Sequence, residues 1–194
     1  MKKIVLLFTM IALINPVWAQ LDFGIKGGLN LSKLILSDPE ASYQSKTGYH
    51  AGIFFQSKFD KVAIQPEVLL YTMQGNFSGP GYTGSEDFTY LTIPVMLKFF
   101  PVKGMNLQLG PQVGMLLNGE RSTTTLVGTV KQDIKDQYEK TDYSVSAGLG
   151  WDFSFGLKLD ARYNIGIKDI NRATNGEEAK SRVFLVSLGW NFLR

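Results

Sequence analysis

Strict alternation of apolar and polar residues runs through positions 157–168, LKLDARYNIGIK. The odd-numbered residues are apolar, and the even-numbered ones are charged, amide or glycine. Alternation with a period of two residues is typical of a β-strand whose two faces meet different surroundings. This segment therefore predicts a strand with one apolar face and one polar face.

The same alternation recurs along the whole chain, without an internal linker or a second domain. The predicted strands are 22–32, 48–58, 61–74, 87–100, 105–119, 138–153, 157–168 and 182–193. Tight turns near 59–60, 101–104 and 154–156 alternate with long polar connections near 33–47, 75–86, 119–137 and 169–181. Short turns at one end and long loops at the other are typical of an outer-membrane barrel. We therefore predict an all-β fold, an eight-stranded antiparallel up-and-down transmembrane β-barrel with short periplasmic turns and long extracellular loops.

The N-terminal segment has the three parts of a secretory signal peptide. Two lysines precede an apolar run over 4–14, which Pro16 ends, and the small residue Ala19 offers a cleavage site. The apolar run is too short to span a bilayer comfortably, which argues against an anchoring helix. We expect 1–19 to be a cleaved signal peptide and 20–194 to be the barrel domain.

Charge and cysteine content exclude several classes of protein. The net charge is +3, but Lys2 and Lys3 of the leader account for two of these positive charges. The other basic residues are scattered, which gives no support for nucleic-acid binding. The chain has no cysteine, so it has neither a disulfide framework nor a cysteine for lipid attachment. After the leader no apolar run approaches about twenty residues, so only strands can cross a membrane.

The polar face of 157–168 indicates which side of the wall meets a bilayer. Facing Lys158 or Arg162 into lipid costs about 2–4 kcal/mol for each side chain at mid-bilayer. The apolar face is therefore expected to meet lipid. A secreted lipocalin-like barrel with its apolar face inward around a ligand is the alternative, and the alternation alone does not exclude it.

Aromatic residues favour the membrane interpretation. They gather on the apolar face at the short-turn ends of the strands, and membrane interfaces select aromatic girdles of this kind. The predicted lipid-interface aromatics are Phe23, Phe55, Phe99, Trp151, Phe153, Trp190 and Phe192. A second level lies toward the long-loop ends and consists of Tyr49, Tyr143 and Phe184.

The polar face predicts a network of side chains inside the barrel. An eight-stranded interior is just wide enough for side chains to fill. Both signs of charge occur there, which favours a paired and plugged core over a narrow ion path. The predicted network residues are Lys26, Glu67, Lys98, Gln108, Gln112, Lys158, Asp160 and Arg162.

Three prolines, Pro66, Pro94 and Pro111, interrupt predicted strands. Proline has no amide hydrogen to donate and is normally confined to strand edges or bulges. Because a closed barrel has no edge, we expect a band of bulges or kinks at these positions. The threonine-rich run 117–128 is expected to extend a strand above the membrane as a hairpin arm.

Residues suited to catalysis or metal binding are scarce. His50 is the single histidine, and without cysteine it makes no zinc set. In the alternation of 48–58 its side chain falls on the face that points into the lumen. We therefore expect it to be a hydrogen-bonding lumen residue. No acid–base–nucleophile set, phosphate loop or dinucleotide motif is visible. We therefore expect no catalytic, cofactor-binding or metal site, and no cofactor.

Several short motifs resemble the PorT-like outer-membrane barrel family of Bacteroidetes in their order and spacing. They are GIKGGLNLS, IQPEVLLYTMQG, YLTIPVMLKFF, LGPQVG and GLGWDFSFGLKLDARYNIG, and the resemblance covers essentially the whole mature chain. It implies an eight-stranded barrel in the outer membrane of a Gram-negative cell. The family is named after a member linked to the type IX secretion pathway. The resemblance brings no catalytic residues.

Three classes of function remain open. We favour a non-enzymatic structural or interaction barrel whose loops or periplasmic turns contact a partner. A small porin-like channel for ions or small solutes is the alternative, and an outer-membrane enzyme has the least support. The expected partners are outer-membrane lipid, the barrel-assembly machinery that reads Trp190 and Phe192, and the secretion-system components that the resemblance implies. We expect no nucleic acid and a monomeric protein.

Overall fold

The structure is a computed structural model that describes residues 20–35, 42–79, 82–125, 128–167 and 180–193. The predicted signal peptide, 1–19, lies outside the described residues, and so does most of the expected loop 169–181.

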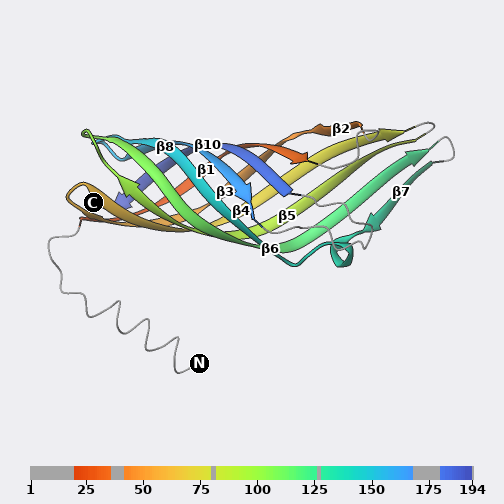
Figure 1. Ribbon diagram of the computed structural model, residues 1–194, viewed down its shortest axis with the longest axis horizontal. Coiled ribbons are helices and arrows are strands. Elements are labelled where there is room, and N and C mark those ends of the chain that lie inside the picture. The colour runs from red at the N-terminus through yellow and green to blue at the C-terminus, as the bar shows by residue number, and fades with distance from the viewer. Residues whose placement is uncertain (1–19, 36–41, 80–81, 126–127, 168–179, 194) are drawn as a thin grey trace, which may run out of the picture.

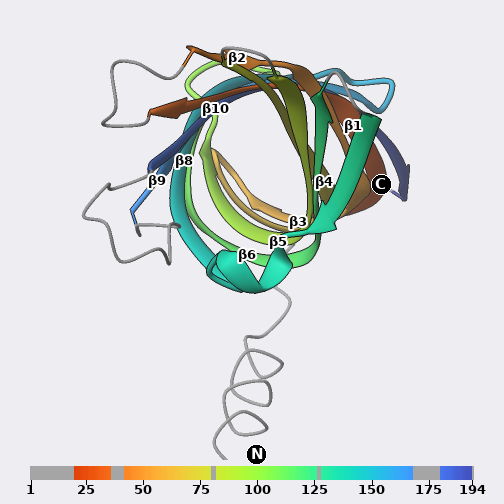
Figure 2. The same ribbon diagram turned by 90° about the vertical axis from the view of Figure 1, so that its right-hand side faces the viewer.

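Eight strands close into a ring in the order in which they occur along the chain (Figures 1 and 2). The elements are β1 (Gln20–Ile35), β2 (Ser42–Ser45), β3 (Thr47–Phe59), β4 (Val62–Gly79), β5 (Tyr82–Phe99), β6 (Met105–Thr125), β7 (Gly128–Asp133), the short 3-10 helix η1 (Lys135–Gln137), β8 (Thr141–Asp152), β9 (Leu157–Gly166) and β10 (Lys180–Leu193). Each ring strand is antiparallel to the next, and β10 returns to pair with β1 from Asn191 opposite Gly24 to Lys180 opposite Ile35. The ring omits only β2 and β7, which confirms the predicted eight-stranded up-and-down barrel.

The three tight connections at one end of the ring each contain a residue with a positive φ angle. Asp60 lies between β3 and β4 with φ 50°, Gly104 precedes β6 with φ 88°, and Gly156 precedes β9 with φ 107°. Left-handed backbone geometry lets a short turn reverse the chain, and glycine adopts it without the steric cost of a Cβ atom. The predicted positions of the short turns are therefore correct.

Side chains along the ring strands alternate between the outside and the lumen. On β9, Leu159 and Ile165 point outward and are 38% and 48% exposed, whereas Asp160 is 3% exposed. An apolar outside is what a hydrocarbon surrounding requires. The lipocalin-like alternative required these apolar side chains to point inward, and they do not. Across the described ranges, no helix has the length and apolar composition needed to cross a membrane.

At the end opposite the tight turns, the strands continue beyond their predicted limits. β4 reaches Gly79 and β5 starts at Tyr82, so most of 75–86, which was expected to be a long loop, is a hairpin. β6 continues to Thr125 and pairs with β7, as expected for a hairpin arm over 117–128, while β2 pairs with the end of β4. Polar residues occupy both faces of these extensions, so the alternation typical of the wall disappears although the backbone pairing continues.

The expectation of bulges or kinks at Pro66, Pro94 and Pro111 was wrong as regards bulges, because the ladders of the described residues show none at these positions. Strand register is the same on both sides of each proline. The pairing of neighbouring strands is instead interrupted at these positions, because a missing amide donor removes a hydrogen bond without adding a residue. The register shifts of the described ladders lie elsewhere, after Phe23 and after Thr89.

Gly110 on β6 is predicted to tolerate no side chain, whereas Gly114 on the same inward face tolerates alanine. A Cβ atom on Gly110 would lie 2.0 Å from the backbone carbonyl oxygen of Val95 on β5. The nearest atom to a Cβ on Gly114 would be 3.6 Å away, in the side chain of Thr92. We expect Gly110→Ala to lower the free energy of unfolding by roughly 1–3 kcal/mol, as overpacking does. Gly114→Ala should change it little.

Urea unfolding of both variants, followed by the heat-dependent gel mobility of the folded barrel, measures this difference. Equal stabilities for the two variants would contradict the close approach of β5 to β6.

Candidate functional site

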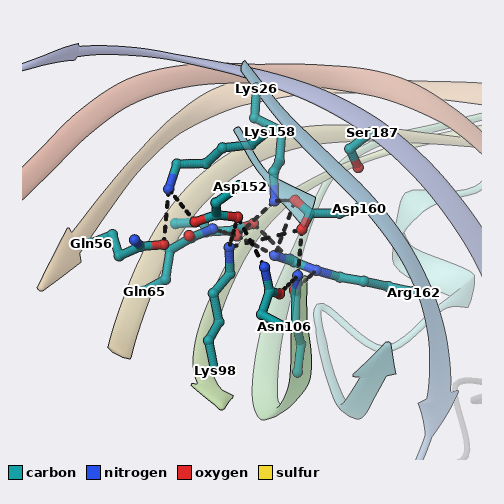
Figure 3. Close-up of polar contacts among 12 residues, drawn as sticks. Lys26, Gln56, Gln65, Lys98, Asn106, Asp152, Lys158, Asp160, Arg162 and Ser187 are labelled. Atoms are coloured by element: carbon teal, nitrogen blue, oxygen red, sulfur yellow. Dashed lines mark hydrogen bonds and ion pairs between the residues drawn. The ribbon is translucent and has the colours of Figure 1, made fainter. Parts of the chain in front are cut away.

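Eight charged side chains from five ring strands meet inside the barrel, and we call them the lumen network (Figure 3). They are Asp22, Lys26, Glu67, Lys98, Asp152, Lys158, Asp160 and Arg162. Four are cations and four are anions, so the network as a whole is neutral. Its side chains are 0% to 14% exposed. A buried charge is tolerated where a partner neutralises it, and each of these charges has one.

The part of the network nearest the tight turns is held together by Lys158. The Lys158 ammonium lies 2.6 Å from Asp152 and 3.2 Å from Asp22. Lys98 approaches Asp152 from β5 at 3.4 Å. Gln56 on β3 completes this level, because it donates to Asp22 at 3.1 Å and accepts from Lys158 at 3.1 Å.

The centre of the network is formed by Asp160, Glu67 and two cations. Lys26 lies 2.5 Å from Asp160 and 2.9 Å from Glu67. Arg162 donates from both terminal nitrogens to Glu67, at 2.9 Å and 2.6 Å. Paired hydrogen bonds of this kind fix both the distance and the orientation of a guanidinium group. Because Lys98 also lies 3.8 Å from Asp160, the two levels form one continuous network.

Amide side chains form hydrogen bonds with several of the charged groups. Gln108 accepts from Arg162 at 2.7 Å and donates to Asp160 and Asn106. Gln65 donates to Glu67 at 2.5 Å. A Cβ atom on Gly150 would lie 2.6 Å from Asp160, so the glycine at this position makes room for the network.

Of the eight residues predicted to form the interior network, six belong to the lumen network, and a seventh, Gln108, forms hydrogen bonds with it. Within the described residues, Gln112 is half-buried and accepts from Asn164 at 3.2 Å rather than joining the network. Asp22 and Asp152, which the prediction omitted, belong to it. Both have inward parity but lie at strand ends, where one more step of the alternation would have identified them.

His50 lies above the network and forms a separate polar contact. Its Nε2 lies 2.8 Å from the Ser187 hydroxyl, and its Nδ1 lies 3.4 Å from Asn30. Asn30 in turn donates to the carbonyl oxygen of Thr72. The described residues contain no group of three or more His, Asp or Glu side chains that could hold a metal ion.

The half of the lumen opposite the tight turns contains a buried apolar cluster, which we call the apolar plug. Its members are Tyr71, Met73, Phe88, Tyr90, Leu116, Ile134, Val183 and Leu185. Ile134 precedes η1 and is 0% exposed, so this segment reaches into the mouth of the barrel. Sequence reasoning missed the plug because its side chains lie on the lumen-facing side of strands such as β4 and β5, which was expected to be polar along its whole length. A cavity of about 20 Å³ lies beside the plug and is lined by Tyr71, Tyr90 and Gln112 among others, with room for roughly one water molecule.

Three polar residues hold the η1 segment over the plug, and we call them the latch. Arg121 donates to Glu86 at 2.7 Å, and the Tyr138 hydroxyl donates to Glu86 at 3.5 Å. The Tyr138 ring packs edge-on against Phe88, with ring centroids 4.8 Å apart. Burial raises the pKa of Tyr138, and the Glu86 carboxylate raises it further, so Tyr138 remains a protonated donor.

The aromatics predicted for the membrane interface lie around the tight-turn end of the barrel. Six of the seven are exposed on the outside, and Phe153 is half-buried. The structure adds Phe155, whose ring lies 5.3 Å from that of Phe153 and 6.4 Å from that of Trp190. Phe155 lies in a turn, where no alternation could reveal it.

Comparison with known proteins agrees with this fold. The family model described as outer membrane protein beta-barrel domain matches residues 18–172. The chain is similar in structure to Ail, the attachment invasion locus protein of Yersinia pestis, with a TM-score of 0.56 and 14% identity over 89% of this chain and 99% of that chain. It is equally similar to Neisserial surface protein A, with a TM-score of 0.56 and 13% identity over 88% of this chain and 97% of that chain. No curated protein sequence matches it.

Identities this low show a shared fold and carry no argument about function. The family match is different, because it extends over well more than half of the sequence. This chain therefore belongs to the outer membrane protein beta-barrel domain family and is an integral protein of the outer membrane.

Proposed function

We propose that the protein is a non-enzymatic outer-membrane barrel with a sealed lumen, and that it acts as a structural or interaction protein through its extracellular end. The neutral lumen network carries this proposal. Every cation of the network has a carboxylate oxygen within 3.4 Å, and the network has no excess of either charge. An ion that entered would have to separate such pairs, and breaking a buried pair costs roughly 3–5 kcal/mol.

A porin-like channel is the second candidate, because the lumen opens at the tight-turn end into a cavity of about 500 Å³. Lys158 and Asp152 line this cavity and also belong to the network, so the opening ends at the buried charges. The apolar plug lies beyond them. These two barriers in series favour a closed barrel over a pore.

The extracellular extension supports an interaction role. It consists of the ends of β4, β5 and β6 together with β2 and β7, and Figure 1 shows it projecting beyond the ring at the end opposite the tight turns. All six residues of β7 are exposed, including Val130 at 68%. Closing a barrel does not require this added length, and segments of this kind commonly carry function. The PorT-like resemblance makes secretion-system components the partners that we propose, for a protein that is a monomer in the membrane.

Purified protein in a planar lipid bilayer is expected to show no steady conductance. The physical reason is that the lumen network and the apolar plug close the path at two levels. A barrel shortened by deletion of 134–138 serves as the comparison, and it should also stay closed because the network remains. Stable single-channel steps from the intact protein would establish the pore instead.

Glu67→Ala and Arg162→Ala are each expected to lower the free energy of unfolding by roughly 3–5 kcal/mol, because each leaves a buried charge without its partner. The double variant should lose less than the sum of the two, since it removes one charge of each sign. Lys131→Ala is the control, because its pair with Glu120 is 70% and 40% exposed and should contribute less than about 1 kcal/mol.

Denaturant unfolding in micelles gives these free energies, and bilayer recordings of the same variants give the conductance. Ion selectivity that shifts with Glu67→Ala or Arg162→Ala, at unchanged stability, would mean that these residues line a path.

A photo-crosslinking amino acid at Val130 is expected to capture a protein partner in the native membrane. The same amino acid at Leu149, which faces outward from β8 and is 52% exposed, should capture lipid and no specific protein. Mass spectrometry of the adducts identifies the partner, and secretion-system components are the expected result. Identical adduct patterns from the two positions would remove the support for an interaction surface on β7.

A further inference from the structure

The cavity at the tight-turn end has the composition of a ligand site. Its volume of about 500 Å³ lies within the range of small-molecule pockets. Among its lining residues, Asp22, Gln56 and Lys158 are 5% exposed or less, so buried polar side chains of the barrel form its inner wall. We call this cavity the vestibule.

The charges of the vestibule favour an anion. Three lysines, Lys58, Lys103 and Lys158, line it against the two carboxylates of Asp22 and Asp152. Both carboxylates already pair with Lys158, at 3.2 Å and 2.6 Å, and Asp152 also pairs with Lys98 at 3.4 Å. Lys58 and Lys103 form no ion pair with a described residue, so two cations remain for a ligand. The Lys58 ammonium lies 4.0 Å from the centre of the Phe100 ring, a cation–π contact that holds it in place.

Two residues that line the vestibule also carry acceptors without donors. The Oδ1 atoms of Asp22 and Asn191 are buried and accept no hydrogen bond from a described residue. An unsatisfied buried acceptor is costly, and a ligand that donates to it recovers that energy. A matching ligand therefore combines a negative group for the lysines with hydroxyl or amide hydrogens for these two oxygens.

The rim of the vestibule is shared with the outer surface of the barrel. Trp151 lines the cavity, yet it is 44% exposed on the outside, and its ring lies 6.2 Å from that of Phe153. Both residues belong to the aromatic band at the level of the membrane interface. A headgroup bound in the vestibule could thus remain attached to a lipid of the adjoining leaflet.

We propose that the vestibule binds a glycerol phosphate group, with the phosphate between Lys58 and Lys103 and the glycerol hydroxyls donating to Asp22 and Asn191. Two sources share this chemistry, the headgroup of phosphatidylglycerol and free glycerol phosphate. The phosphate uses the two unpaired lysines, and the hydroxyls use the two unsatisfied oxygens. Inorganic phosphate would bind the two lysines and would leave the two oxygens without a donor.

The test compares the intact mature protein with two altered forms and one control. Lys58→Ala/Lys103→Ala removes the cations, and Asn191→Leu removes one acceptor. Lys61→Ala is the control, because Lys61 is exposed in the turn beside β3 and does not line the vestibule. Heat-dependent gel mobility first establishes that every variant is folded.

One arm titrates free glycerol 1-phosphate and inorganic phosphate into protein in neutral detergent and follows binding by phosphorus NMR. Glycerol phosphate should bind at least tenfold more tightly than inorganic phosphate, and Asn191→Leu should abolish that preference. Lys58→Ala/Lys103→Ala should weaken binding at least tenfold, whereas Lys61→Ala should leave it unchanged.

The other arm uses nanodiscs that contain phosphatidylglycerol and phosphatidylethanolamine, and measures the lipid retained by the protein in native mass spectrometry. Retention of one phosphatidylglycerol that depends on Lys58 and Lys103 but not on Lys61 supports the lipid source. Binding of the free compound without lipid retention supports the soluble source. The proposal is overturned if neither form binds, if glycerol phosphate and phosphate bind alike, or if Lys61→Ala has the same effect as the double variant.

Discussion

The neutrality of the lumen network is the condition on which the rest of this barrel depends. Four cations and four anions lie inside a ring of eight strands, and a single unpaired charge there would cost several kcal/mol. The partners come from distant parts of the chain, since Lys158 on β9 meets Asp22 on β1, and Arg162 meets Glu67 on β4. These pairs form only when the ring closes in the correct register. Strand order, register and charge balance therefore support one another.

The lumen has three levels with different physical properties. The vestibule at the tight-turn end is polar and open, the lumen network in the middle is charged and closed, and the apolar plug at the other end is buried under η1. The latch ties the plug to the extracellular extension, because Arg121 lies on the same β6 extension that pairs with β7. A partner that binds the extension therefore contacts a strand, β6, that also helps to hold η1 over the mouth of the barrel.

Sequence reasoning predicted the wall well because each wall strand has one face toward lipid and one toward the lumen. The alternation over 157–168, together with the cost of exposing charges to lipid, placed Lys158, Asp160 and Arg162 inside, as the structure shows. The same reasoning failed beyond the wall, where a strand no longer has one face toward lipid and the other toward the lumen. The hairpin over 75–86 is rich in glycine and polar residues and has no regular alternation of apolar and polar residues, so it was taken for a loop.

The other errors also have physical causes. Apolar residues of the plug such as Phe88 and Tyr90 lie on the lumen-facing side of the strand, which was expected to be polar along its whole length. Gln112 faces the lumen, as predicted, but it lies farther from the tight turns than the charged residues. The alternation shows which face of the wall a side chain is on and does not show its level along the barrel axis. The prolines interrupt pairing without shifting the register, a distinction that depends on the neighbouring strand.

The accessibility of the lumen centre tests the sealed barrel most directly. The chain has no cysteine, so a single introduced thiol reports on its position without background. Ser146 points into the lumen from β8 and is 1% exposed, whereas Ser154 lies exposed in the turn before β9. The protein is placed in permeabilised liposomes, so that a charged methanethiosulfonate reagent reaches both faces of the membrane. The reagent should modify Ser154→Cys rapidly and leave Ser146→Cys unmodified until the barrel is unfolded. Modification of Ser146→Cys at a rate close to that of Ser154→Cys in the folded protein would show an open lumen and contradict the account.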